Sequence, residues 1–169
     1  MLASNLDKKK FENICIIDTN AKIGSKIKVS GGAKCNITNE LVTASNYLGD
    51  REFVAELLEK FSKNELLAFL NKNAVMPKIN PKIVKGTYFC NSSQDVIDMF
   101  TKLTTHVKKY LNTTVLDIDF DKHFKIKTDS KTIEAKKVVV ASGGLSYPVL
   151  GASSLAFDIA KKFGHTITK

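Results

Sequence analysis

The sequence contains no apolar run approaching the roughly 18 residues that span a bilayer, and its first residues lack the hydrophobic segment of a secretory signal. We therefore expect a cytoplasmic protein with no membrane partner. It has only three cysteines, Cys15, Cys35 and Cys90, which are widely spaced and form no C-x-x-C pair. This spacing indicates neither a disulfide framework nor a zinc site, and no metal is expected. Cys15, within an apolar run, is predicted to be a small buried hydrophobe.

Arginine is also scarce, since Arg51 is the only one in a chain whose net charge is +9. Proteins that read base edges or clamp phosphates favour arginine, and the lysines here are scattered over nearly every segment. The single run, residues 8–10, is interpreted as the solvated face of a short helix. We expect no nucleic-acid partner, with a basic nucleic-acid-binding module as the remote alternative.

The most informative stretch is 30–39, S-G-G-A-K-C-N-I-T-N, which combines two glycines, a cation, a thiol and several short polar side chains. Adjacent glycines allow positive φ and close approach to a ligand, while the polar side chains can orient one. A simple turn is the alternative, because Gly, Ser and Asn are common turn formers. Cys35 is the one candidate for a reactive side chain, because the neighbouring Lys34 could lower its pKa.

Two other segments resemble strands that end in ligand-binding residues. Residues 11–18 form a short apolar run ending at Asp18, an acid placed to bind a ribose hydroxyl pair, although a solvated strand-end aspartate is equally ordinary. Residues 138–141 form a β-branched strand that stops at Ser142, Gly143 and Gly144. Because ligands lie beyond the carboxyl ends of parallel strands, we expect the two strands to be near neighbours with their ends at one edge.

These segments, together with G-G-L-S-Y-P at 143–148 and A-K-K-F-G-H at 160–165, resemble the bacterial aminoacetone-oxidase-like flavoproteins, also described as NAD(P)/FAD-dependent oxidoreductases. The resemblance runs from about Phe11 to the last residue. It implies an α/β fold, with 1–169 as a single partial FAD-binding domain. That domain would be an incomplete doubly wound, Rossmann-like domain of the glutathione-reductase type, with a parallel sheet, a β-hairpin and covering helices.

The resemblance also implies the cofactor and its contacts. FAD would be held, with NADH or NADPH as reductant, and hydride transfer at the flavin would act on an unknown small-molecule substrate. Asp18 would bind the adenosine ribose, Val115 would lie near the adenine, and the turn at 141–144 would contact the cofactor through its backbone. The two glycine-rich turns would converge on one pocket. The cofactor-binding residues implied are Asp18, Gly24, Lys26, Ser30, Gly31, Gly32, Lys34, Cys35, Asn36, Thr38, Asn39, Val115, Ala141, Ser142, Gly143 and Gly144.

One feature of the family is missing, since no G-x-G-x-x-G occurs anywhere in the 169 residues. That loop cradles the pyrophosphate at a helix N-terminus. Ala33 and Lys34 also replace a glycine and an arginine of the family pattern. We expect a truncated segment that lacks the first strand, and two alternatives remain open. The chain is either the FAD-binding segment of an oxidoreductase or a non-catalytic remnant that binds FAD weakly or not at all.

The remaining sequence predicts scaffold. Helices are expected over 53–61, from a capping box at Ser62, and from Ser92 through a stripe that reaches Val107 and Leu111. A loop is expected over 74–85, a hairpin around 121–122, and a last helix from Ser153 or Ser154 to Gly164. His106, His123 and His165 are interpreted as structural, His106 on the polar face of the long helix, so no catalytic side chains are predicted.

Overall fold

The computed structural model describes residues 1–7, 9–79, 85–146 and 148–167. The chain forms two compact units: Met1–Asn5 with Lys26–Thr105, and Leu6–Ser25 with His106–Lys169. Parallel pairing, antiparallel sheets and helices are all present, which confirms the predicted α/β class.

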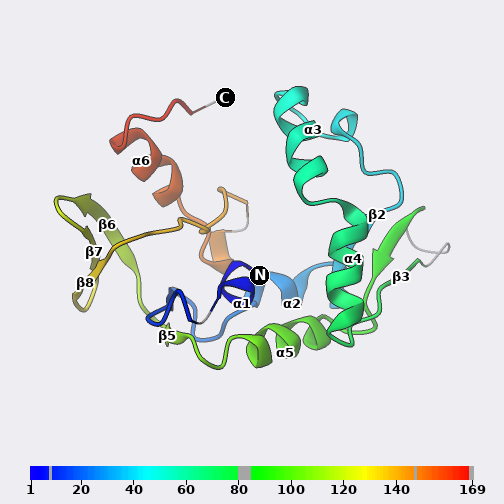
Figure 1. The fold of residues 1–169 in the computed structure, drawn as a ribbon, viewed down its shortest axis with the longest axis horizontal. Helices are drawn as coiled ribbons and strands as arrows, with labels where there is room; N and C mark the ends of the chain where they lie inside the picture. Colours follow the sequence, from blue (N-terminus) through cyan, green and yellow to red (C-terminus); the bar gives the residue numbers. More distant parts are fainter. Residues whose placement is uncertain (8, 80–84, 147, 168–169) are drawn as a thin grey trace. The chain divides into compact units, whose positions relative to one another are not determined.

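The first unit contains a three-stranded antiparallel sheet of order β2-β4-β3 together with helices, and Figure 1 shows α4 and α5 beside this sheet. Side chains of α4 and α5 share one buried cluster with residues of the sheet region. The elements are α1 Leu2–Asn5, α2 Ser25–Val29, β2 Asn36–Asn39, η1 Ala44–Asn46, α3 Arg51–Lys60, α4 Lys63–Lys72, β3 Lys78–Ile79, β4 Thr87–Phe89 and α5 Ser93–Leu103.

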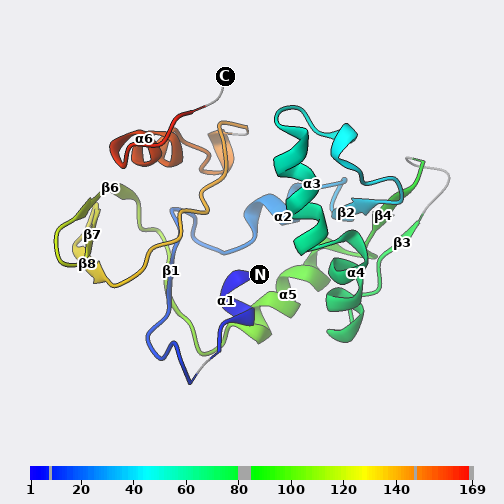
Figure 2. The ribbon, with the colours of Figure 1, turned by 45° about the horizontal axis from the view of Figure 1, so that its top comes forward.

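The second unit contains a two-stranded parallel sheet, β1-β5, and an antiparallel meander of order β6-β7-β8; Figure 2 shows β1 and the meander. Helix α6 packs on the meander, where Ile159 joins the buried cluster of Ile118 and Ile126. The elements are β1 Cys15–Ile17, β5 Lys108–Tyr110, β6 Val115–Phe120, β7 Phe124–Thr128, β8 Thr132–Ala135, η2 Pro148–Leu150 and α6 Leu155–Lys162.

Several predicted elements are confirmed together with their end signals. The hairpin joins β6 and β7, and Ser92 caps α5 through its side chain. Helix α6 ends in a Schellman arrangement, because His165 N–H donates to the Ala160 carbonyl and Gly164 adopts φ +83°.

Two strand and helix predictions are wrong. The helix from Ser92 ends at Leu103, and the segment after it pairs in parallel with β1, which satisfies backbone groups that a longer helix would have bonded internally. The strand predicted at 138–141 has no regular structure; the strand lies earlier, at β8, where alternate side chains face the meander core. A lone extended segment needs a ladder partner, and no described strand pairs with 138–141.

Smaller corrections concern 74–85 and the lysine run. Lys78–Ile79 form a two-residue strand against β4 rather than a loop, and residues 80–84, including Pro81, lie outside the described part. Helix α1 ends at Asn5, so Lys9 and Lys10 occupy a turn held by Asp7, while residue 8 is not described.

The capping box of α4 provides a direct test of local stability. Ser62 Oγ accepts from Glu65 N–H at 3.3 Å, and Glu65 Oε2 accepts from Ser62 N–H at 2.6 Å. We expect Ser62→Ala to lower the free energy of unfolding by about 1 kcal/mol, because it removes the side-chain acceptor. Urea denaturation measures this change. Ser62→Asp keeps an acceptor and should retain most of the stability; an equal loss in both variants would contradict the capping role.

An ion network joins α6 to β6. Lys162 Nζ contacts Asp117 Oδ2 at 2.7 Å and Asp119 Oδ1 at 2.5 Å, and Lys127 Nζ contacts Asp119 Oδ2 at 2.8 Å. Hydrogen bonds from Lys127 and then Lys162 lower the pKa of Asp119 to about 2, and the bond from Lys162 lowers the pKa of Asp117.

This network predicts a defined pH dependence. Because the carboxyl pKa values are depressed in the folded state, their stabilisation is present above their ordinary values near 4 and is lost as pH falls towards 2. Lys162→Gln should lower the melting temperature by a few degrees at pH 7, and the difference from the unmodified chain should shrink below pH 4. Lys161→Gln, one residue away and exposed, is the control. A deficit that stays constant down to pH 2 would contradict this origin.

Candidate functional site

Asp18 lies directly after parallel strand β1 and is fixed there by the backbone. Its N–H donates to the Tyr110 carbonyl at 2.9 Å, and its own carbonyl accepts from Thr113 N–H at 3.1 Å. The sequence placed an acid at the carboxyl end of a parallel strand, and the structure has one there, half-buried. Dinucleotide-binding folds hold a ribose with an acid at this end of a parallel strand, and that role for Asp18 stays a prediction.

The Asp18 carboxylate is oriented by Asn20, a residue the sequence analysis missed. Asp18 Oδ1 accepts from Asn20 N–H at 2.9 Å and from Asn20 Nδ2 at 3.0 Å. Asn20 Nδ2 also donates to the Leu150 carbonyl at 3.2 Å. Among the described residues no group bonds Asp18 Oδ2, which is left as an acceptor. The D-x-N spacing, which favours local Asx turns, was the signal in the sequence.

A nearby glycine leaves room for this asparagine. A Cβ at Gly151 would lie 3.1 Å from Asn20 Nδ2, and Gly151 has φ +87°, a value that side chains other than glycine rarely adopt. The arrangement Asp18–Asn20–Leu150 thus belongs wholly to the second unit and depends on the turn that follows η2.

The other predicted residues of the second unit have mixed placements. Val115 opens β6 and packs, half-buried, against the meander cluster, to which Ile17 and Val138 also belong. Segments 15–18 and 138–141 therefore flank one core, although not as paired strands. Residues Ala141, Ser142 and Gly143 are exposed, Gly144 is half-buried, and Tyr147 lies outside the described residues. Gly24 and Gly143 have φ +83° and +76°.

The glycine loop of the first unit is a left-handed turn. Gly31, Gly32 and Ala33 have φ of +58°, +62° and +67°, and Cys35 has φ +54°. The N-terminal region of α5 supports this turn: Ser93 N–H donates to the Ala33 carbonyl at 2.8 Å, and Cys90 N–H to the Lys34 carbonyl at 2.9 Å. Residues 31–34 remain exposed.

Some polar side chains of this loop are already engaged by hydrogen bonds or packing within the chain. Asn39 Nδ2 donates to the Lys85 carbonyl and to Thr87 Oγ1, and its Oδ1 accepts from Leu41 N–H, so its side chain holds the ends of the strands together. Asn36 packs against Gly31. Roles for these residues, and for Lys26, Ser30, Lys34 and Thr38, in holding a cofactor stay predictions, as does convergence of the two turns.

Two cysteine predictions are wrong. Cys15 is exposed rather than buried, because the short strand β1 turns it outward. Cys35 is buried, and burial raises its pKa, so the predicted lowering of that pKa by the neighbouring Lys34 is wrong. The chain bends at Cys35, which sends this thiol into the core while Lys34 stays exposed.

His106 lies beyond α5 rather than on its polar face, and both of its ring nitrogens are buried without a hydrogen-bond partner among the described residues. His165 lines an apolar cavity of about 350 Å³ in the second unit, together with Phe124, Val138, Ile159 and others. Neither predicted glycine turn contributes to that lining. No helix in the described part is long and apolar enough to cross a membrane, and no cluster of three or more potential metal ligands occurs in the same ranges.

A carboxylate at the end of a parallel strand in an α/β fold is a feature that nucleotide-binding, Rossmann-like proteins share. All 169 residues match the family described as the HI0933-like protein Rossmann domain, and the chain belongs to this flavoprotein family. It is 32% identical over 169 residues to a ribosomal RNA dihydrouridine synthase of Escherichia coli, covering 97% of the chain and 42% of that protein.

Two further relatives are similar at 29% identity. One is a ribosomal RNA dihydrouridine synthase of Haemophilus influenzae, of which the match covers 40%, and the other a 3-dehydro-bile acid delta(4,6)-reductase of Clostridium scindens, of which it covers 38%; each match covers 92% of the chain. The chain thus spans about two fifths of the length of the curated relatives it matches.

Proposed function

We propose that this chain is the FAD-binding segment of a flavin-dependent oxidoreductase. The observation that carries the proposal is the Asp18 carboxylate, held by Asn20 at one oxygen with the other left as an acceptor. Two ribose hydroxyls donate to such a carboxylate in dinucleotide-binding folds. The match of the whole chain to a flavoprotein family supports FAD as the nucleotide.

The roles of the residues follow from their positions. Asp18 accepts hydrogen bonds from the adenosine ribose, and Asn20 keeps its carboxylate in place. The turn at 141–144 offers backbone N–H groups to the cofactor. FAD supplies hydride transfer when bound, with NADH or NADPH as the proposed reductant. The residues of the protein bind FAD and orient it for this reaction.

The names of the relatives suggest the reaction class. A dihydrouridine synthase and a delta(4,6)-reductase both add hydrogen across carbon–carbon double bonds. We propose the same class for the protein to which this segment contributes, with a small unsaturated molecule as substrate. The single arginine and the scattered lysines favour a small molecule over RNA.

An RNA substrate is the second candidate, favoured by the net charge of +9 and by two of the relatives. Binding of ribosomal RNA fragments by the chain separates the two candidates. A small-molecule enzyme should show only weak binding that disappears at about 0.2 M salt and does not depend on sequence. Binding that prefers one RNA sequence at that salt would establish the second candidate.

Affinity for FAD tests the main proposal against a non-binding remnant. Without G-x-G-x-x-G, the pyrophosphate loses backbone N–H contacts and a helix dipole, each worth up to about 1–2 kcal/mol. We expect saturable binding with a dissociation constant between about 10 µM and 1 mM, followed by flavin fluorescence. ADP should compete and riboflavin should not, because Asp18 holds the adenosine half. Absence of saturable binding would favour the remnant.

A further inference from the structure

Cys35 and Cys90 lie opposite each other where β2 and β4 meet the glycine loop. The antiparallel register ends with the pair of Asn36 and Phe89; Cys35 directly precedes Asn36, and Cys90 directly follows Phe89. Cys90 N–H lies 3.4 Å from the Cys35 carbonyl oxygen. Cys90 N–H also donates to the Lys34 carbonyl at 2.9 Å, so the two cysteines are held beside each other by backbone hydrogen bonds, as a disulfide requires.

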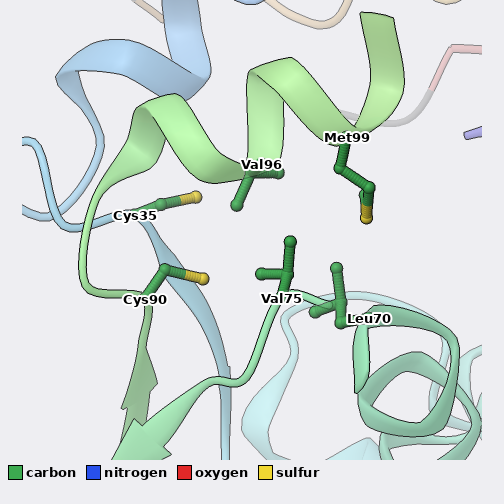
Figure 3. Close-up of a cluster of buried hydrophobic side chains, with 6 residues drawn as sticks. All are labelled: Cys35, Leu70, Val75, Cys90, Val96 and Met99. Atoms are coloured by element: carbon green, nitrogen blue, oxygen red, sulfur yellow. The ribbon is translucent and has the colours of Figure 1, made fainter. Parts of the chain in front are cut away.

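The two side chains enter the same part of the core. Figure 3 shows both thiols directed into the cluster that contains Leu70, Val75 and Val96. Cys35 is 5% exposed and Cys90 is 4% exposed. Burial raises the pKa of both thiols, that of Cys90 to about 11, with the charge of Cys35 as a further cause. Each cysteine is therefore a protonated thiol at neutral pH.

We propose that Cys35 and Cys90 form a reversible intramolecular disulfide when a small hydroperoxide oxidises them. One thiol attacks a peroxide oxygen as its thiolate, which gives a sulfenic acid and releases water. The second thiol attacks the sulfenic sulfur, so that the S–S bond forms, the S–O bond breaks and a second water leaves. In total, two thiols lose two electrons and two protons, and one hydrogen peroxide is reduced to two waters. A dithiol reverses the step.

Because both thiols are buried, only a small oxidant can reach them. Hydrogen peroxide is small and uncharged and can reach a buried thiol, whereas the raised pKa of both cysteines makes the reaction slow. Exposed Cys15, in the other unit, reacts with bulky alkylating reagents first. The pair is thus oxidised slowly, and Cys15 has to be replaced or blocked before the pair is tested.

The disulfide would tie the left-handed turn to the segment that precedes α5. It closes the long loop of chain between Cys35 and Cys90, which includes α3 and α4. Closing so long a loop restricts the unfolded chain, so we expect the melting temperature to rise by at least about 5 °C on oxidation. This inference does not depend on FAD binding.

The test uses the full chain carrying Cys15→Ser, which leaves Cys35 and Cys90 as its cysteines. After treatment with hydrogen peroxide, thiols are counted in denaturant and the intact mass is measured. We expect the two thiols to disappear, the linked pair of cysteine peptides to weigh about 2 Da less than the two reduced peptides together, and both changes to reverse with dithiothreitol. Peptide mapping without reduction should link Cys35 to Cys90.

Cys90→Ser in the same background is the matched control, and its Cys35 peptide should gain oxygen atoms and form no intramolecular link. Oxidation of the unsubstituted chain after Cys15 has been alkylated repeats the test without any substitution. The proposal is overturned if both thiols persist, if the peptides that contain Cys35 and Cys90 gain oxygen atoms instead of being linked, or if the linked species is a dimer on a non-reducing gel; oxygen gained by the exposed methionines Met1 and Met76 is counted separately.

Discussion

Gly31→Ala is expected to lower the free energy of unfolding by roughly 2–4 kcal/mol. Gly31 has φ +58°, and a Cβ there would overlap Asn36 Oδ1 and lie 3.0 Å from the Asn36 backbone nitrogen. Left-handed backbone costs an L-residue about 1–2 kcal/mol, and the overlap adds a comparable amount. Urea denaturation followed by far-UV circular dichroism measures the loss.

Gly32→Ala is the matched control for this substitution. Gly32 has nearly the same φ, +62°, but a Cβ there would meet nothing within 4 Å. It should cost only the backbone strain, about 1 kcal/mol, since Ala33 already adopts φ +67° in the same turn. Equal losses in the two variants would show that contact with Asn36 contributes nothing.

Asp18→Asn should weaken FAD binding by about tenfold or more, equivalent to about 1.4 kcal/mol. The substitution keeps the shape of the side chain but replaces a charged acceptor with an amide, and hydrogen bonds to charged groups are worth about 1.5–3 kcal/mol. Asn20→Ala removes the groups that orient the carboxylate, and should weaken binding by a smaller factor. Fluorescence titration measures both.

Glu12→Gln makes the same change of charge at an exposed residue just before β1, and should leave the affinity unchanged. If Glu12→Gln weakens binding as much as Asp18→Asn does, general electrostatic attraction rather than a specific ribose contact would explain the result.

Sequence signals predicted the structural features that depend only on residues close together in the chain. The capping box at Ser62, the hairpin around residues 121–122 and the end of α6 at Gly164 each follow from contacts within a few residues. Asp18 was found because a short apolar run ended in an acid, and that acid does follow a parallel strand.

Features that depend on distant partners were not predictable in the same way. The apolar stripe predicted for the helix extends through Val107 to Leu111, but residues 108–110 pair with β1, more than ninety positions earlier in the chain. Residues 138–141 have strong β propensity, yet a strand needs a ladder partner, and β8 is the strand that pairs with β7. Likewise, the burial of Cys35 follows from the positive φ of the turn before it, which the neighbouring Lys34 does not reveal.

The central claim is that the adenosine half of FAD binds at Asp18. Titration of the ¹⁵N-labelled chain with FAD, followed by amide chemical shifts, tests it most directly, because this measurement detects binding even at millimolar dissociation constants. The account predicts that the amides of Asp18, Asn20 and Gly143 shift together and saturate with one dissociation constant, and that Asp18→Asn raises this constant about tenfold or more. Shifts that leave Asp18 and Asn20 unmoved at saturation would contradict it.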